Sequence, residues 1–157
     1  MGRSGSDIIT TSMNENKLYI IKVGGNIIDD ATKLSTFLSS FSTLKGKKIL
    51  VHGGGKLATQ LAADLSIPQQ MVDGRRITDA ETLKLVTMVY AGLINKQLVA
   101  SLNAMNAPSI GLSGADGNCI TAHKRVHPTI DFGFVGNLIK GIMRLNSLKP
   151  SRNAVGK

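Results

Sequence analysis

The chain has 157 residues, a formal net charge of +9 and one cysteine, Cys119. This length is enough for one domain with a hydrophobic core, and without a run of 18 apolar residues we expect no membrane-spanning helix. A single cysteine cannot form an internal disulfide, which fits a cytoplasmic protein. The positive charge is concentrated in residues 124–157, but no nucleic-acid-binding motif accompanies it, so we expect no nucleic-acid partner.

The strands and helices expected along the chain alternate. In order, the pattern predicts a strand at 17–25, a helix at 30–44, a strand at 47–55, a helix at 56–66, a loop or short hairpin at 71–78, a long helix at 79–104, a third strand with a glycine-rich loop at 108–118, and a β-rich segment at 121–138. Asp30 is the expected N-cap of the first helix, and Thr78 with Glu81 forms an expected capping box for the long one. The alternation predicts an α/β fold with an open, mainly parallel sheet and helices on both faces.

Three parts of the chain differ in composition. We expect residues 1–16 to be a polar leader and residues 17–138 to form the folded lobe. Residues 139–157 are an atypical basic tail with a weak apolar pattern, and no acidic residue occurs after Asp131.

Two predicted strands end in glycine-rich turns that are followed by helices, with the sequences KVGGN at 22–26 and HGGGK at 52–56. In open α/β sheets, ligands bind beyond the carboxyl ends of the strands, and glycines let backbone amides approach an anion. Lys22 lies inside an otherwise apolar strand, where an unpaired ammonium group is costly to bury. The pattern therefore favours a site for a phosphate or carboxylate. The alternative is that the Lys22 stem lies along the sheet edge with its amine in water.

Other motifs are incomplete. The phosphate-binding P-loop pattern fails because Leu57 follows Lys56, whereas Gly53-x-Gly55-x-x-Ala58 with Asp73 meets the dinucleotide fingerprint in a loose form. His123 and His127 have the spacing of some zinc ligands, but no cysteine or carboxylate completes the set, so we expect no metal-binding residues. A guanidinium at Arg75 or Arg76 would suit capture of a carboxylate.

Taken together, the motifs resemble those of the amino-acid kinase family, and within it the branch that phosphorylates N-acetyl-L-glutamate in arginine biosynthesis. The segments that carry the resemblance follow the family order from residue 18 to 138: IIKVGGNII, ILVHGGGK, VDGRRITDAETLKLVTMVYAGLINKQLVASL, GLSGADGN and FGFVGNL. The resemblance implies transfer of a phosphoryl group from ATP, bound with Mg²⁺, to the side-chain carboxylate of N-acetyl-L-glutamate or N-succinyl-L-glutamate.

The resemblance also implies roles for individual residues. Lys22 would stabilise charge on the transferring phosphoryl group, Gly24 and Gly25 would lie beside the phosphates, and Arg76 would hold a carboxylate of the substrate. Gly54 and Gly55 would donate backbone amides to the substrate, and Gly54 also to the phosphoryl oxygens. The helix 79–104 resembles the helix through which the family forms homodimers.

Family members continue into a second half that supplies most of the nucleotide pocket, and residues 139–157 do not align with it. We therefore expect the N-terminal lobe of the amino-acid kinase fold, with the C-terminal lobe missing. Three functions stay open: a kinase or a fragment of one, a non-catalytic module that binds an acidic metabolite, and a dinucleotide-binding oxidoreductase domain.

Overall fold

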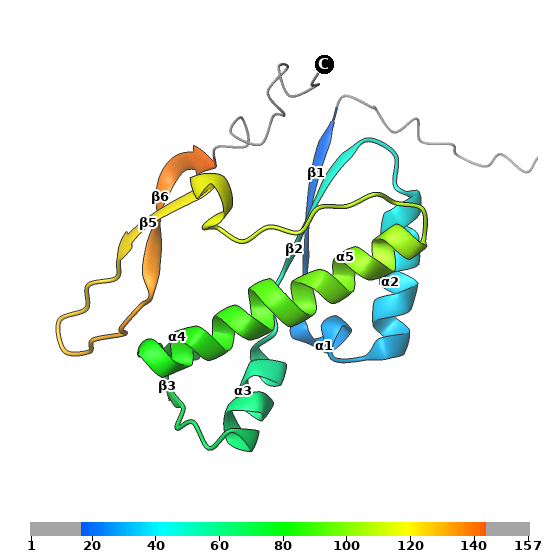
Figure 1. Cartoon of the computed structure of the whole chain (residues 1–157). Coiled ribbons are helices and arrows are strands. Elements are labelled where there is room, and N and C mark those ends of the chain that lie inside the picture. The colour runs from blue at the N-terminus through cyan, green and yellow to red at the C-terminus, as the bar shows by residue number, and fades with distance from the viewer. Residues whose placement is uncertain (1–16, 144–157) are drawn as a thin grey trace, which may run out of the picture.

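The computed structural model describes residues 17–143 (Figure 1). The predicted leader 1–16 lies outside these residues, as does most of the basic tail. The elements in chain order are β1 (Leu18–Val23), α1 (Gly25–Ile28), α2 (Ala31–Thr43), β2 (Lys47–His52), α3 (Gly55–Asp64), β3 (Gln70–Val72), β4 (Arg75–Ile77), α4 (Ala80–Thr87), the π-helical segment η1 (Met88–Ile94), α5 (Asn95–Ala104), the short 3₁₀ turn η2 (Asp116–Asn118), β5 (Ile120–Lys124) and β6 (Gly136–Met143).

Strands β1 and β2 form a parallel pair in which Ile21 lies opposite Leu50 and Lys22 lies opposite Val51. A parallel pair needs a crossover connection, and α1 and α2 supply it. Asp30 caps α2 as predicted, since its Oδ1 accepts a hydrogen bond from the Lys33 N–H at 3.0 Å. The predicted α/β fold with a parallel sheet and packed helices is confirmed.

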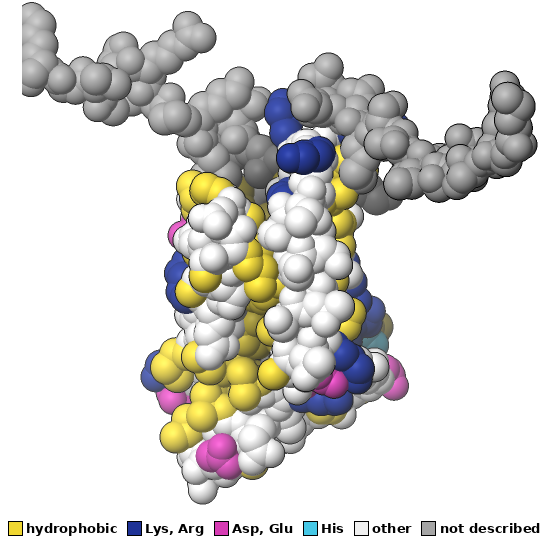
Figure 2. Space-filling model, turned by 90° about the vertical axis from the view of Figure 1, so that its right-hand side faces the viewer, with side chains coloured by type: hydrophobic (Ala, Val, Ile, Leu, Met, Phe, Trp, Pro, Cys, Tyr) yellow, Lys and Arg dark blue, Asp and Glu magenta, His cyan; other side chains and the backbone are white. Residues whose placement is uncertain are grey.

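The hydrophobic core lies between one face of this strand pair and the helices. Ile21 and Leu50 pack against a buried cluster contributed by α2, α3, α4, η1 and α5. Its members are Leu38, Phe41, Ala58, Ala62, Leu85, Val89, Ile94, Leu98 and Leu102. Figure 2, which views the α2 side of the molecule, shows hydrophobic side chains gathered in a band between paler ridges of uncharged surface.

The opposite face of the strand pair is open to solvent. Leu18, Ile20 and Val51 are 48%, 59% and 41% exposed, and because side chains alternate along a strand they share a face with Lys22. The described helices thus pack on one face of the pair, where the prediction had placed helices on both.

Two hairpins complete the described part of the chain. Strands β3 and β4 are antiparallel and are joined by Asp73 and Gly74, whose φ angles of 49° and 73° fit a type I′ turn. Strands β5 and β6 are also antiparallel, which agrees with the β-rich segment predicted at 121–138. Strand β6 continues to Met143, five residues beyond the boundary drawn at 138, so the division of the chain stays a prediction.

The third strand predicted at 108–118 is absent from the described residues. Instead, side chains of α5 satisfy the backbone there: Asn103 Oδ1 accepts from the Ser109 N–H at 2.9 Å, and Lys96 Nζ donates to Gly111 O at 3.0 Å. A cavity of about 490 Å³ lies between this segment, β2 and α5. The prediction was wrong because polar side chains, which the apolar pattern does not register, take the place of the strand partner.

The long helix predicted at 79–104 is continuous from Ala80 to Ala104. Its N-cap is Asp79, which accepts from the Thr82 N–H at 2.8 Å, and not the predicted Thr78. The backbone of Thr78 instead bonds to Phe132 O and to the Phe134 N–H, at 3.0 and 2.7 Å.

The helix Ala80–Ala104 has 25 residues and is apolar enough, by length and composition alone, to cross a membrane. This is weak evidence, because a core helix meets the same criterion, and the expectation of no membrane-spanning helix stays a prediction.

Replacing Gly54 by alanine will destabilise the fold. A Cβ at Gly54 would overlap Ile94 Cδ1 and lie 3.1 Å from Tyr90 Cδ1, whereas a Cβ at Gly53 would meet nothing within 4 Å. We expect Gly54→Ala to lower the free energy of unfolding by about 1–3 kcal/mol, as overpacking of a close contact does. Urea denaturation of both variants measures the difference, and equal effects of Gly54→Ala and Gly53→Ala would show that the contact is not rigid.

Candidate functional site

Lys22 lies near the carboxyl end of β1 on the open face of the strand pair. Its side chain is exposed, and no ion pair or hydrogen bond joins it to another described residue. The cost of a buried ammonium group therefore does not arise in this structure, which corrects the premise that Lys22 is buried. The ammonium group is left available to an anion at the end of the strand.

Gly24 and Gly25 form the turn between β1 and the single helical turn α1. The carbonyl of Gly24 accepts hydrogen bonds from the Ile27 and Ile28 N–H groups at 3.1 and 3.2 Å. Position 24 has open space around it, whereas a Cβ at Gly25 would lie 3.2 Å from Asp29 Oδ2. This turn lies directly beside Lys22 in the chain.

Gly54 and Gly55 lie at the start of α3, immediately after β2. Gly54 is the N-cap residue and Gly55 is the first residue of this ten-residue helix. The amides of a first helical turn have no partner within the helix, and together they give it a partial positive charge. The carboxyl end of β2 thus presents backbone donors to an anion.

Arg76, on β4, lies across this same helix start. Its Nη2 donates to Thr59 Oγ1 at 2.9 Å and lies 3.4 Å from Gly55 O, while Nη1 donates to Gln69 Oε1. These bonds to described residues use three of the five guanidinium N–H groups, so two are left to bind a ligand. The structure therefore brings Arg76 to the Gly54–Gly55 turn, while Arg75 is exposed.

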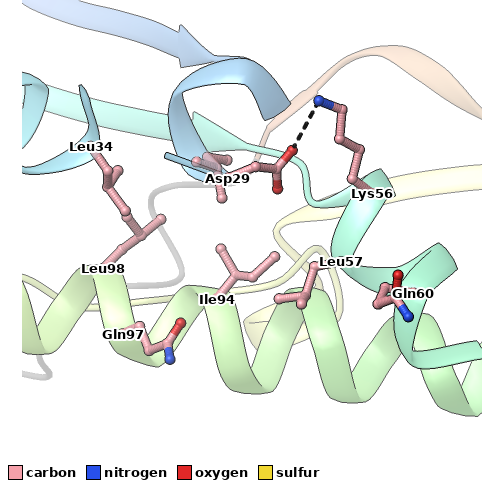
Figure 3. Close-up of a pocket in the computed structure, with 9 residues that line it drawn as sticks. Asp29, Leu34, Lys56, Leu57, Gln60, Ile94, Gln97 and Leu98 are labelled. Atoms are coloured by element: carbon pink, nitrogen blue, oxygen red, sulfur yellow. Dashed lines mark ion pairs between the residues drawn. The ribbon is translucent and has the colours of Figure 1, made fainter. Parts of the chain in front are cut away.

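The two glycine-rich turns are also linked by an ion pair. Asp29 follows the first turn and Lys56 follows the second, and their Oδ2 and Nζ atoms lie 3.9 Å apart (Figure 3). They stand at the rim of a pocket of about 400 Å³ whose lining includes Leu57, Ile94 and Leu98. The pocket places a polar rim and an apolar lining beside both turns.

The third glycine-rich loop, at residues 111–118, meets the end of β2 through α5. Asn95 Nδ2 lies 3.4 Å from both Leu112 O and His52 Nε2. Within the loop, the Ser113 N–H and hydroxyl donate to Asp116 Oδ2 at 2.6 and 2.7 Å. These two bonds, with a smaller contribution from Lys96, hold the pKa of Asp116 below its ordinary value of 3.8.

Sequence reasoning missed the partners of Arg76. Thr59 lies one helical turn beyond Gly55 on the same face of α3, a spacing that could have indicated it. Gln69 precedes the hairpin and carries no motif, so only the fold reveals it. Asp73, the acid of the loose dinucleotide fingerprint, lies in the β3–β4 turn with φ at 49° and not at the end of a parallel strand.

His123 and His127, the residues with zinc-like spacing, lie in and after β5. His127 packs edge-on against Phe132, with ring centroids 5.7 Å apart. Within residues 17–143, no group of three His, Cys, Asp or Glu side chains could hold a metal ion.

Comparison with known proteins finds relatives that agree with one another in family. The profile of the amino acid kinase family matches residues 17–147. The acetylglutamate kinase of Cytophaga hutchinsonii is 61% identical over 125 residues, which cover 79% of this chain and 47% of that protein. The acetylglutamate kinase of Phocaeicola vulgatus is 56% identical over 126 residues, with 80% and 49% covered. The chain thus spans about half the length of the curated relatives it matches.

Solved structures share the fold. The protein smu.665 of Streptococcus mutans superposes with a TM-score of 0.61 at 20% identity, over 78% of this chain and 49% of that one. The N-acetylglutamate synthase of Neisseria gonorrhoeae, in complex with coenzyme A and N-acetyl-glutamate, gives 0.61 at 21% identity, over 77% and 28%.

Removing the Ser113 hydroxyl will raise the pKa of Asp116 toward 3.8 without reaching it, because the Ser113 N–H bond remains. A carboxylate whose pKa is lowered in the folded state stabilises the fold above pH 3.8, and this contribution is lost as the pH falls through the folded-state pKa. Ser113→Ala should therefore weaken the acid dependence of unfolding. NMR titration of the Asp116 carboxyl carbon measures the shift.

Ser109→Ala is the matched control, since the Ser109 hydroxyl donates to Ala107 O at 2.8 Å and does not contact Asp116. An Asp116 pKa that responds equally to both substitutions would contradict the assignment.

Proposed function

The chain belongs to the amino acid kinase family, and on this premise we propose that it is the substrate-binding part of a kinase that transfers a phosphoryl group from ATP to the side-chain carboxylate of N-acetyl-L-glutamate. Two kinds of observation support the proposal. Relatives at 50–61% identity are acetylglutamate kinases, and the Arg76 guanidinium lies at the Gly54–Gly55 turn. The second observation carries the proposal, because a guanidinium beside a helix start suits a carboxylate-bearing ligand.

Binding of the substrate is assigned to Arg76, Gly54 and Gly55. A guanidinium binds a carboxylate through two parallel hydrogen bonds, and a helix start adds backbone donors to the same anion. Thr59 and Gln69 fix the guanidinium before the ligand arrives, so less side-chain freedom is lost on binding. A dicarboxylate such as N-acetyl-L-glutamate would place one carboxylate at Arg76 and leave the other to react.

Phosphate contacts are assigned to Lys22, Gly24, Gly25 and Gly54. Lys22 supplies a charge at the end of β1, and the glycine turns let the phosphates approach the backbone. Phosphoryl transfer leaves little covalent chemistry for the protein, so the role of these groups is to position the two substrates and to stabilise negative charge in the transition state. Lys22 is the residue proposed to stabilise the charge that develops on the transferring group.

ATP enters the proposal as the co-substrate, with Mg²⁺ bound to its phosphates. In the part of the chain that the structure describes, no group of three His, Cys, Asp or Glu side chains could hold a metal ion, and the carboxylate of Asp29 is paired with Lys56. We therefore assign no step to a protein-held metal.

Further features of the proposal concern assembly and location. Met88 and Leu93 are 55% and 45% exposed on the helix Ala80–Ala104, which supports a homodimer through this helix. The kinship with biosynthetic enzymes supports a cytoplasmic location. N-succinyl-L-glutamate is the alternative substrate, with the same carboxylates and a larger acyl group.

A second candidate function is a non-catalytic module that binds an acidic metabolite. The observation in its favour is that Arg76 lies at the Gly54–Gly55 turn, an arrangement that suits a carboxylate and needs no nucleotide. Transfer requires a nucleotide as well, so binding without turnover distinguishes this candidate from the kinase.

Arg76→Ala will weaken binding of N-acetyl-L-glutamate. Loss of hydrogen bonds between charged groups costs about 1.5–3 kcal/mol, which corresponds to a roughly 10- to 150-fold rise in Kd. Isothermal titration calorimetry of the full chain measures this effect. Arg75→Ala is the control, since Arg75 is exposed and should leave Kd within about twofold. Equal Kd values for the native chain and Arg76→Ala would remove Arg76 from the substrate site.

Lys22→Met will weaken binding of ATP by about tenfold or more, because a hydrogen bond between the ammonium group and a phosphate is lost. It should leave the Kd of N-acetyl-L-glutamate almost unchanged, the opposite of Arg76→Ala. Calorimetry with each ligand, together with an ADP-release assay, separates the two roles. Turnover that disappears in Lys22→Met supports the kinase, whereas substrate binding with neither ATP binding nor turnover supports the binding module.

A further inference from the structure

Asn95 is a buried polar residue at the centre of a hydrogen-bond chain that ends at the second glycine-rich turn. It is 7% exposed and is the first residue of α5. Its Nδ2 lies 3.4 Å from Leu112 O and 3.4 Å from His52 Nε2, and its Oδ1 lies 3.1 Å from Lys96 Nζ. A buried amide with all of its groups engaged holds a defined orientation.

The partners of the Asn95 amide fix the direction of each hydrogen bond. Leu112 O can only accept and the Lys96 ammonium can only donate, so the nitrogen and oxygen of the Asn95 amide cannot be exchanged. Asn95 Nδ2 therefore donates to His52 Nε2, and this ring nitrogen has to be the unprotonated one.

The other ring nitrogen of His52 gives the same answer independently. His52 Nδ1 lies 3.0 Å from Gly53 O, and a carbonyl oxygen can only accept. Nδ1 therefore carries the proton. Both contacts select the neutral imidazole with its proton on Nδ1, the form in which the two bonds can exist together.

This tautomer determines the orientation of the next peptide group. The peptide between Gly53 and Gly54 is planar and trans, so a carbonyl held on one side directs the Gly54 N–H to the other. No described residue accepts a hydrogen bond from this N–H. A Cβ at Gly54 would also overlap Cδ1 of Ile94, the residue before Asn95.

We propose that Asn95 is a positioning residue which, acting through His52, holds the Gly53–Gly54 peptide so that the Gly54 N–H is free to bind an anion. Two charged groups lie near these hydrogen bonds, Lys96 on α5 and Asp116 in the 111–118 loop, and Lys96 is the one that contacts Asn95. The identity of the anion rests on the proposed function, but the tautomer of His52 does not.

The tautomer can be measured directly by long-range ¹H–¹⁵N correlation NMR of the histidine rings, at a pH where they are neutral. The chain has three histidines, and His127 is an internal reference with the other tautomer. The Thr129 N–H donates to His127 Nδ1 at 3.4 Å, so the proton of the neutral His127 ring is on Nε2. We expect the Nδ1–H pattern for His52. An Nε2–H pattern for His52 in the native chain would overturn the proposal without any variant.

Asn95→Asp tests the coupling, because a carboxylate of the same shape can accept but not donate. His52 should then carry a proton on Nε2, which donates to the new carboxylate. In the neutral ring Nδ1 then has no proton, and Gly53 O loses its hydrogen-bond donor. Asn103→Asp is the matched control on the same helix, since Asn103 Oδ1 already acts as an acceptor, from the Ser109 N–H at 2.9 Å, and the carboxylate retains that role. An unchanged His52 pattern in Asn95→Asp, or an equal change in Asn103→Asp, would overturn the proposal.

Anion binding completes the test, with inorganic phosphate and N-acetyl-L-glutamate as probes. We expect Asn95→Asp to raise the Kd of a probe that binds the native chain by about tenfold, and Asn103→Asp to leave it unchanged. A native chain with the Nδ1–H tautomer that binds neither probe would overturn the proposed function and the role of the Gly54 N–H. Intact binding with the Nε2–H tautomer would overturn the positioning inference alone.

Discussion

The close approach of Gly54 to the helix Ala80–Ala104 is the contact on which the rest of the site depends. The same helix forms a wall of the core through Leu85 and Leu98 and meets the glycine turn at Tyr90 and Ile94. Between these regions the helix follows a π-helical path from Met88 to Ile94, and a π turn adds a residue to the helical repeat, often at functional sites. The consecutive residues Ile94 and Asn95 thereby meet Gly54 on one side and His52 with Leu112 on the other. Core packing and site geometry are thus parts of one arrangement.

A second constraint brings Arg76 to the start of α3. The type I′ turn at Asp73–Gly74 sets the register of β3 and β4, and this register fixes where Arg76 stands relative to α3. Its bonds to Thr59 and Gly55 then connect the hairpin to the start of the helix. Because the Arg76 guanidinium and the start of α3 are both positive and lie together, they repel one another in the free protein, and an anion bound there would relieve this repulsion.

The sequence predicted features that depend on local chemistry and missed those that depend on tertiary contacts. The parallel strands, the Asp30 cap and the glycine turns follow from apolar pattern and turn residues, and they are found within a few residues of their expected bounds. The cap of the long helix was misplaced by one residue because the backbone of Thr78 pairs with Phe132 and Phe134, 54 and 56 residues further along the chain. The expected strand at 108–118 failed for a similar reason, since three polar side chains of α5 hold that segment. No local pattern carries such information, and Gln69, a partner of Arg76, was missed on the same grounds.

The exposure of the open face of β1 and β2 determines how strongly the Lys22 ammonium group can attract an anion. Lys22 shares this face with Ile20 and lies opposite Val51, and both apolar neighbours are exposed. In water the attraction between an ammonium group and a phosphate 4 Å away is only about 1 kcal/mol, but at an effective dielectric constant near 20 it rises to about 4 kcal/mol. A layer that covered Ile20 and Val51 would bury apolar surface and exclude water from Lys22 at once. The apolar residues around this lysine thus make the strength of its attraction to an anion depend on what packs over the sheet, so the hydrophobic effect and the proposed binding of phosphate are linked through a single surface.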